Sequence, residues 1–354
     1  MVPTAYFKSV DVEVAVEGRV TYDVEQAIRE VERGKVAIAL FTFDAVSPWD
    51  GPLRLPTRPG WPKSVFIVGE PANPPRAVGR WEARLDWEEP FETFQKRVQA
   101  AKRSLEEGEV FQLVVARYRR YRFSGDVWPI LEALKKRVSA KYYYLLDLGD
   151  LSVVGASPET LVRVEDGYAI SGPIGGTRPR GSTPEEDEEL TQELINSVKE
   201  RAEHVMLVDS VRNDLGRVCR WGTVEVVDML RVEKYTHYQH LVSYIRCRLD
   251  KLYRPIDAVL ALNPTTTVTG VPKPRALELI SQLEEPRGPF TGSIGVITRQ
   301  MLDFAVVIRS LYVEHMHAYL WAGAGIVTDS TAEREWEETK VKMRPLAEIL
   351  EGKV

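Results

Sequence analysis

One stretch of the sequence, residues 171–217, constrains the fold and the site of this chain more than any other. It opens with a loop, SGPIGGTRPRG, in which Gly175 and Gly176 let the backbone approach a bound molecule closely because they carry no side chain. Helical signals follow: Thr183 suits an N-cap, Pro184 suits the first helical position, and an apolar pattern of helical period continues beyond them. We therefore expect a ligand-binding loop followed by one long helix.

Spaced carboxylates occur on two predicted helices. Glu200 and Glu203 lie three residues apart in the first helix. Glu335 and Glu338 repeat this spacing near the C-terminus, where Lys342 falls on the same helical face. A solvated charged face would explain either pair taken alone. Both pairs together, in a chain with few histidines, would instead favour a hard cation, Mg²⁺ before Zn²⁺.

Polar residues at the ends of predicted strands complete the set of candidates. Gln112 lies on an apolar strand, where its amide needs a partner, and Glu159 lies in a turn between two strands. Arg309 ends another strand, and the backbone N–H groups of Gly323 and Gly325 could bind a carboxylate. Each feature has an ordinary structural explanation by itself. Together they predict one site for an anionic small molecule.

Composition limits the classes of function. The formal net charge of -5 argues against non-specific nucleic-acid binding, and no run of about 18 apolar residues could span a membrane. The N-terminus lacks the pattern of a signal peptide, so a cytoplasmic location is expected. Cys219 and Cys247 predict neither a disulfide framework nor a CxxC metal site. His237 and His240 have no third ligand at suitable spacing, so a two-histidine metal site is not expected.

Nine motifs in the chain resemble those of the chorismate-utilising enzyme family and occur in the family's order. They are EGEVFQLVVAR (107–117), GASPE (155–159), PIGGTRPRG (173–181), KERAEHVMLVDSVRNDLGRV (199–218), QHLVS (239–243), TVTGVPKPRALELI (267–280), RGPFTGSIGVI (287–297), VIRS (307–310) and WAGAGIVTDSTAEREWEETKVK (321–342). The resemblance implies an α+β fold in which antiparallel β-sheets pack in a sandwich with helices outside. It implies one chorismate-binding domain over 1–354, with a shortened N-terminal part (1–90) and a catalytic core (91–345).

The resemblance also implies a magnesium site. Glu203 and Glu338 would bind Mg²⁺, and Glu200 and Glu335 would hold its water ligands. The cation would bind the ring carboxylate of chorismate, close to Lys342. This assignment agrees with the preference of Mg²⁺ for a few protein carboxylates together with water and substrate oxygens.

Further roles are implied for the remaining candidates. Arg309 and the Gly323–Gly325 amides would hold the enolpyruvyl carboxylate, and Thr177 would contact the ring. Glu159 would act as general acid on the departing C4 hydroxyl, and His240 would assist the elimination of pyruvate. Loss of hydroxide without a proton donor is difficult, so the chemistry requires a group such as Glu159.

Two positions discriminate between members of the family. Gln112 stands where isochorismate- and salicylate-forming members carry a lysine that activates water, so ammonia is favoured as the nucleophile. Gly175 stands where aminodeoxychorismate-forming members commonly carry a nucleophilic lysine. The resemblance therefore implies a lyase similar to component I of the anthranilate-forming branch, which aminates chorismate at C2 and eliminates pyruvate. Formation of aminodeoxychorismate is the alternative within the family, and a non-catalytic chorismate-binding relative is the alternative outside enzymes.

The source of ammonia is a separate question. Neither cysteine lies in a nucleophile elbow of the kind found in glutaminases. Ammonia would therefore come from solution or from a separate glutamine amidotransferase subunit, which implies a hetero-oligomer with that partner.

Two departures from the family bear on feedback inhibition by tryptophan. Residues 139–144 read SAKYYY where NPSPYMF is common, and the N-terminal part lacks the LLES segment. In the family these two elements form the tryptophan pocket. We therefore expect weak or absent inhibition when L-tryptophan is titrated against product formation. Inhibition at micromolar tryptophan would contradict this prediction.

Overall fold

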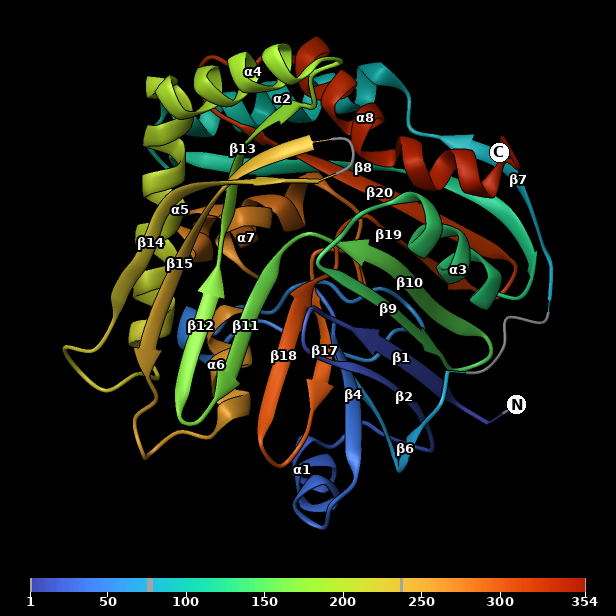
Figure 1. Ribbon diagram of the computed structural model, residues 1–354. Helices are drawn as coiled ribbons and strands as arrows, with labels where there is room; N and C mark the ends of the chain where they lie inside the picture. The colour runs from blue at the N-terminus through green and yellow to red at the C-terminus, as the bar shows by residue number, and fades with distance from the viewer. Residues whose placement is uncertain (1, 75–78, 236–237, 354) are drawn as a thin grey trace.

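A computed structural model describes residues 2–74, 79–235 and 238–353 of the chain, and His237 lies outside this described part. Two large β-sheets form the centre of the molecule, with helices around them (Figure 1). Neighbouring strands run antiparallel in both sheets. The α+β sandwich implied by the motifs is confirmed.

The first sheet contains the two long strands that reach the site. Its order is β16 (Gly270–Val271), β8 (Gln112–Gly125), β20 (His317–Ile326), β19 (Ser310–Glu314), β10 (Leu151–Ser157), β9 (Tyr142–Asp147), β1 (Thr4–Lys8), β2 (Glu13–Glu17) and β6 (Pro71–Ala72), with β7 (Trp81–Glu88) also paired to β8. The hairpin of β9 and β10 is the one that the sequence predicts through Gly149 and Asp150.

The second sheet carries the glycine loop strand and the histidine strand. Its order is β13 (Ile174–Pro179), β15 (Tyr238–Arg248), β12 (Tyr168–Gly172), β11 (Thr160–Glu165), β18 (Met301–Val306), β17 (Ser293–Ile297), β4 (Val36–Phe41), β5 (Ser64–Gly69) and β3 (Arg19–Thr21), with β14 (Glu225–Lys234) also paired to β15. The N-terminal strands thus belong to both sheets, because β1 lies within the first and β4 within the second.

An apolar layer fills the space between the sheets. Phe7 and Tyr144 enter it from the first sheet, and Ile38, Val296 and Ala305 enter it from the second. All five side chains are buried, so the layer contributes to stability through removal of apolar surface from water. Tight packing of this kind also fixes the position of one sheet relative to the other.

Helices cover the outer faces. The α-helices are α1 (Val24–Glu32), α2 (Phe91–Glu106), α3 (Trp128–Arg137), α4 (Pro184–Asn196), α5 (Val198–Gly216), α6 (Pro255–Leu262), α7 (Lys273–Leu283) and α8 (Ala332–Leu350), and the 3₁₀ turns are η1 (Pro48–Asp50) and η2 (Thr266–Val268). α5 packs on β13 and β15 of the second sheet, and α8 packs on β20 of the first (Figure 1). None of the helices in the described part of the chain is long and apolar enough to cross a membrane.

The single long helix predicted after Thr183 is wrong. Two helices, α4 and α5, occupy this region, and the backbone leaves helical geometry at Ser197 (φ -66°, ψ 110°). The Ser197 hydroxyl accepts a hydrogen bond from the Glu200 N–H, so it acts as an N-cap that the apolar periodicity does not reveal. Because α5 starts in a new direction, Val198 and Val205 are 82% and 46% exposed instead of entering the core.

The two cysteines are also paired, which the sequence analysis did not expect. Cys219 directly follows α5 and Cys247 lies near the end of β15, and a disulfide joins them with a Cα–Cα distance of 6.0 Å. The packing of α5 on β15 brings together residues that are 28 positions apart. Proximity of this kind depends on tertiary structure.

A buried ion cluster connects three segments near the base of α5. The Lys273 ammonium lies 3.0 Å from both Asp50 and Asp214, and it donates a hydrogen bond to the Ala261 carbonyl. All three charged side chains are almost fully buried. The cluster thereby holds α5, α7 and η1 together.

Replacing Lys273 by methionine tests the importance of this cluster. The substitution removes the buried ammonium from two buried carboxylates and leaves Arg217 as their remaining cation, so we expect a loss of about 3 kcal/mol in the free energy of unfolding, measured with urea. Lys340→Met is the matched control, because Lys340 pairs with Glu337 on the exposed face of α8 and should cost about 1 kcal/mol or less. Equal losses for the two variants would contradict the prediction.

Candidate active site

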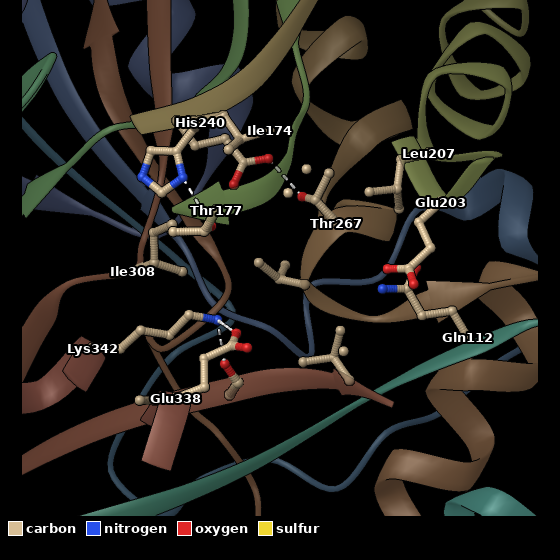
Figure 2. Close-up of a pocket in the computed structure, with 18 of the residues that line it drawn as sticks. Gln112, Ile174, Thr177, Glu203, Leu207, His240, Thr267, Ile308, Glu338 and Lys342 are labelled. Atoms are coloured by element: carbon tan, nitrogen blue, oxygen red, sulfur yellow. Dashed lines mark hydrogen bonds and ion pairs between the residues drawn. The ribbon is translucent and has the colours of Figure 1, made fainter. Parts of the chain in front are cut away.

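A cavity of about 300 Å³ lies where α5 and α8 approach each other over strands of both sheets (Figure 2). The structure brings all the candidate residues into its wall. They are Gln112, Glu159, Thr177, Glu200, Glu203, His240, Arg309, Gly323, Gly325, Glu335, Glu338 and Lys342. Their positions agree with a single site, while their individual roles remain predictions.

The four carboxylates of the predicted magnesium site come from two helices, and positively charged side chains lie next to each pair. On α5, Glu200 accepts a hydrogen bond from Arg178 at 3.0 Å, and Lys199 lies 3.8 Å from Glu203. On α8, Lys342 forms an ion pair of 2.5 Å with Glu338. Within the described ranges, no three His, Cys, Asp or Glu side chains form a ready-made metal cluster.

The donor set nevertheless fits a hard cation. One oxygen of Glu203, Oε1, is buried without a hydrogen-bond partner, which is uncommon for a carboxylate. Burial raises the pKa of Glu203, and the nearby charges of Glu200, Glu335 and Glu338 raise it further against the opposing effect of Lys199. A bound divalent cation would supply the missing partner and remove this repulsion, and oxygen ligands suit Mg²⁺.

Glu159 is the strongest candidate for a proton donor. It lies between β10 and β11, it is buried, and burial raises its pKa to about 7. Thr267 donates a hydrogen bond of 2.6 Å to Glu159 Oε1, which stabilises the charged form and opposes part of the shift (Figure 2). A carboxyl group with a pKa near neutrality is suited to general acid catalysis.

Thr267 was not among the residues predicted for the site. It lies in η2, within the stretch TTTVTG (265–270), which carries four threonine hydroxyls. The density of hydroxyls in this loop was the available signal. Only the fold shows that one of them reaches Glu159.

His240 and Thr177 lie on adjacent strands and contact each other. They are register partners in β15 and β13, and the Thr177 hydroxyl lies 3.0 Å from His240 Nδ1 (Figure 2). Burial lowers the pKa of His240 to about 3, and the positive charge of Arg309 contributes to this effect. The imidazole is therefore neutral at physiological pH.

Two cations form the opposite end of the cavity. Arg309 has a left-handed backbone (φ 51°), an uncommon conformation for a residue with a side chain, and its guanidinium donates to the Lys342 carbonyl at 3.2 Å. The Lys342 ammonium donates to the Gly323 carbonyl at 2.8 Å. Strain of this kind often occurs where a side chain is held for function. The two cations are suited to bind a carboxylate.

Gln112 lies on the other side of the cavity beside Glu203 (Figure 2). It is buried, and its carbonyl oxygen Oε1 has no hydrogen-bond partner. A Cβ placed on Gly325 would come within 2.4 Å of Gln112 Nε2, so glycine at position 325 leaves the room that the amide occupies. The unpartnered oxygen is available to accept a hydrogen bond from a ligand.

The glycine loop is closed from behind by a histidine. A Cβ on Gly175 would lie 2.7 Å from Nδ1 of His204, which is buried and bonded through Nε2 to Ser243 at 2.7 Å. A larger side chain at position 175 would therefore displace His204. Arg180, near the end of the same loop, forms an ion pair of 2.7 Å with Asp187 of α4.

The sequence matches the family model described as chorismate binding enzyme over residues 58–348. The chain belongs to the chorismate-binding enzyme family. The match covers most strands of both sheets and every residue of the cavity wall that was predicted from the motifs.

Two curated proteins with similar sequences are both named anthranilate synthase component 1. The chain is 43% identical over 270 residues to an anthranilate synthase component 1 of Aquifex aeolicus, a match that covers 75% of this chain and 55% of the relative. It is 42% identical over 256 residues to an anthranilate synthase component 1 of Saccharolobus solfataricus, covering 72% and 61%. The chain thus spans a little more than half the length of these curated relatives.

Solved structures show the same fold. Anthranilate synthase component I from Streptococcus pneumoniae superposes with a TM-score of 0.79 and 27% identity, covering 97% of this chain and 89% of that chain. The menaquinone-specific isochorismate synthase MenF from Escherichia coli superposes with a TM-score of 0.82 at 20% identity, covering 98% and 88%. The second likeness concerns the fold alone.

The hydrogen bond from Thr267 should keep the pKa of Glu159 lower than burial alone would make it. Thr267→Val removes a donor that favours the charged form, so the pKa of Glu159 should rise by about one unit above its value near 7. Isotope-edited infrared titration of the glutamate carboxyl band, assigned with Glu159→Gln, measures this change. Thr267→Ser retains the hydroxyl and should match the wild type. An unchanged or lower pKa in Thr267→Val would contradict the prediction.

Proposed function

We propose that this chain is a cytoplasmic, magnesium-dependent lyase that converts chorismate and ammonia into anthranilate, pyruvate and water. The proposal rests on one observation above all. A buried carboxylic acid, Glu159, a neutral imidazole, His240, and the two cations Arg309 and Lys342 line the same cavity. The name shared by the similar curated relatives supports it.

The two carboxylates of chorismate can be bound by different groups of the cavity wall. Arg309 and the backbone near Gly323 and Gly325 would hold the enolpyruvyl carboxylate, and Thr177 would contact the ring. The ring carboxylate would lie toward Lys342 and the glutamates of α5 and α8. This orientation directs the C4 hydroxyl toward Glu159.

The first step forms a C–N bond at C2 and breaks the C–O bond at C4. Ammonia attacks C2, the ring double bonds shift, and the C4 hydroxyl leaves as water after it takes the proton of Glu159. Gln112 can accept a hydrogen bond from the attacking ammonia, because its Oε1 has no other partner. An amide cannot deprotonate water, so Gln112 favours ammonia over water as nucleophile.

The second step aromatises the ring. The hydrogen at C2 leaves as a proton, the bond between the ring and the enolpyruvyl oxygen breaks, and pyruvate leaves after its methylene carbon is protonated. Neutral His240 can accept a proton in this step, and its hydrogen bond with Thr177 orients the ring. The sum of the two steps balances in atoms and charge.

Glu203 and Glu338 would hold the magnesium ion, with Glu200 and Glu335 holding its waters. When bound, Mg²⁺ supplies positive charge that draws electron density from the ring carboxylate. Glu338 would then exchange part of its ion pair with Lys342 for the cation. The buried oxygen Oε1 of Glu203, which has no hydrogen-bond partner in the protein, supports this assignment because a cation could bind to it.

The formation of aminodeoxychorismate by a covalent lysine adduct is disfavoured. The position of that lysine is Gly175, and His204 occupies the space behind it. We further propose that a separate glutamine amidotransferase subunit delivers the ammonia, since the name component 1 in the relatives implies a second component. Free ammonium should support the reaction in its absence.

Incubation with chorismate, Mg²⁺ and ammonium at about pH 8 tests the proposed reaction, with products identified by fluorescence and mass spectrometry. This pH balances free ammonia, which increases with pH, against protonated Glu159, which decreases above pH 7. We expect anthranilate and pyruvate in equal amounts. Aminodeoxychorismate without pyruvate, or no turnover, would overturn the proposal.

Variants separate the acid from the metal ligands. Glu159→Gln should lower kcat by ~10²–10⁴-fold at every Mg²⁺ concentration, because the proton donor is lost. Glu338→Gln should shift the Mg²⁺ dependence to higher concentration. The matched control is Glu337→Gln, since Glu337 pairs with Lys340 outside the cavity and should behave as the wild type. Identical Mg²⁺ dependence for Glu338→Gln and Glu337→Gln would contradict the metal role.

A further inference from the structure

Helix α8 carries three of the cavity residues on one face, Glu335, Glu338 and Lys342. The rotation of α8 about its own axis therefore decides where these groups point, because a shift by one residue turns a helix by about 100°. Between residues 332 and 343, the buried residues are Ala332, Trp336, Thr339 and Met343, which lie on the neighbouring face, about 100° around the helix. Only two of these, Trp336 and Met343, are large and apolar.

Electrostatic repulsion acts against this half of the helix. Glu335 and Glu338 of α8 line the same cavity as Glu203 of α5, and Lys342 is paired with Glu338 there. Like charges on two helices favour separation of α8 from α5 until a cation is bound. Some contact on the inner face must resist this separation.

Arg117 makes such a contact. It lies on β8 below α8, and its side chain is completely buried (0% exposed). Its Nε donates a hydrogen bond of 2.7 Å to Thr339 Oγ1, and its guanidinium lies 3.6 Å from the centre of the Trp336 ring. Trp336 and Thr339 directly follow Glu335 and Glu338 in the sequence. One side chain thus contacts the residue that follows each of the two glutamates.

The guanidinium is also tied to the first sheet. Arg117 Nη1 donates to Glu88 of β7 at 2.9 Å, and Glu88 is shared with Arg119. Arg117 Nη2 is buried without a hydrogen-bond partner. Replacing a buried ion pair by apolar residues of similar volume often leaves a protein equally stable or more stable. A contribution to stability therefore does not explain why an arginine occupies this position. The Arg117 guanidinium is planar and its N–H donors are directional, so its contacts can hold α8 at a defined rotation.

We propose that Arg117 is a positioning residue that sets the rotation of α8 through Thr339 and Trp336, and thereby presents Glu335 and Glu338 to the cation. This inference rests on the proposed function, because it takes the two glutamates as ligands of the metal. It adds to the site a residue that touches neither the cation nor the substrate. Its effect should be seen in the order of α8 and in cation binding.

The test compares Arg117→Met and Thr339→Val with the wild type. Hydrogen exchange of the amides in residues 332–343 reports the order of α8 without any metal. Titration with Mn²⁺, followed by electron paramagnetic resonance in the absence of chorismate, reports cation binding. We expect faster exchange in this segment and an increase of about tenfold in the Mn²⁺ dissociation constant for both variants.

Two further variants serve as controls. Arg119→Met removes the same kind of charge beside Glu88 and should leave exchange in 332–343 and Mn²⁺ binding unchanged. Thr339→Ser retains the hydroxyl that accepts from Arg117 and should restore wild-type values. If Arg117→Met does not fold, Thr339→Val decides the question, because it leaves the arginine in place.

The outcomes separate this inference from the proposed function. Unchanged exchange in 332–343, or faster exchange with unchanged Mn²⁺ affinity, would overturn the role of Arg117. A wild-type protein that binds no Mn²⁺ would overturn the metal assignment in the proposed function. In that case, faster exchange in 332–343 together with a higher KM for chorismate would support the positioning role through Lys342, and an unchanged KM would overturn it.

Discussion

The site depends on the packing of two helices against two different sheets. α5 packs on β13 and β15 of the second sheet, and α8 packs on β20 of the first. The carboxylates that line the cavity therefore come from helices that pack on different sheets, and the apolar layer between the sheets helps to fix their relative position. Because this layer is tightly packed, it transmits position across the molecule as a rigid body would. The sandwich is thus part of the site as well as its support.

The treatment of charge differs between the interior and the cavity. In the interior, Lys273 is paired with Asp50 and Asp214, and the fully buried Arg287 forms an ion pair of 2.8 Å with Glu284. At the cavity, Glu203 Oε1 and Gln112 Oε1 are buried without hydrogen-bond partners, and Lys199 lies 3.8 Å from the glutamate oxygen. Asp44 Oδ2 in the interior shares this property, but the two oxygens on the cavity wall lie where a ligand can supply the partner.

Local patterns predicted much of the secondary structure. Phe91, Phe94, Val98 and Ala101 follow a helical period in the sequence and lie in α2, and Gly149 with Asp150 forms a turn signal between the strands β9 and β10. The prediction of one helix after Thr183 failed, because the Ser197 cap interrupts an apolar pattern that continues through it. Periodicity describes which side of a helix is apolar, but a change in helix direction depends on packing.

The spacing of Glu200, Glu203, Glu335 and Glu338 did not distinguish a metal site from a solvated face. The order of nine motifs favours a metal site, and this assignment stays a proposal. Neither the spacing of the glutamates nor the order of the motifs predicted other contacts of the site. Thr267 is far from Glu159 in sequence, and Arg117 lies more than two hundred residues before Thr339. Neither pairing has a local pattern, because strand pairing and helix packing place the partners together.

The sequence by itself determined the inventory of chemical groups: carboxylates at helical spacing, glycines where the backbone must come close, an amide in place of a base at position 112, and the order of the family motifs. These are properties of neighbouring residues, and local sterics and periodicity are sufficient to read them. The tertiary structure decided the pKa of Glu159, the neutrality of His240, the disulfide and the support of α8 by Arg117. Each of these depends on burial or on a contact between distant segments, and both arise only when the two sheets and their helices have packed.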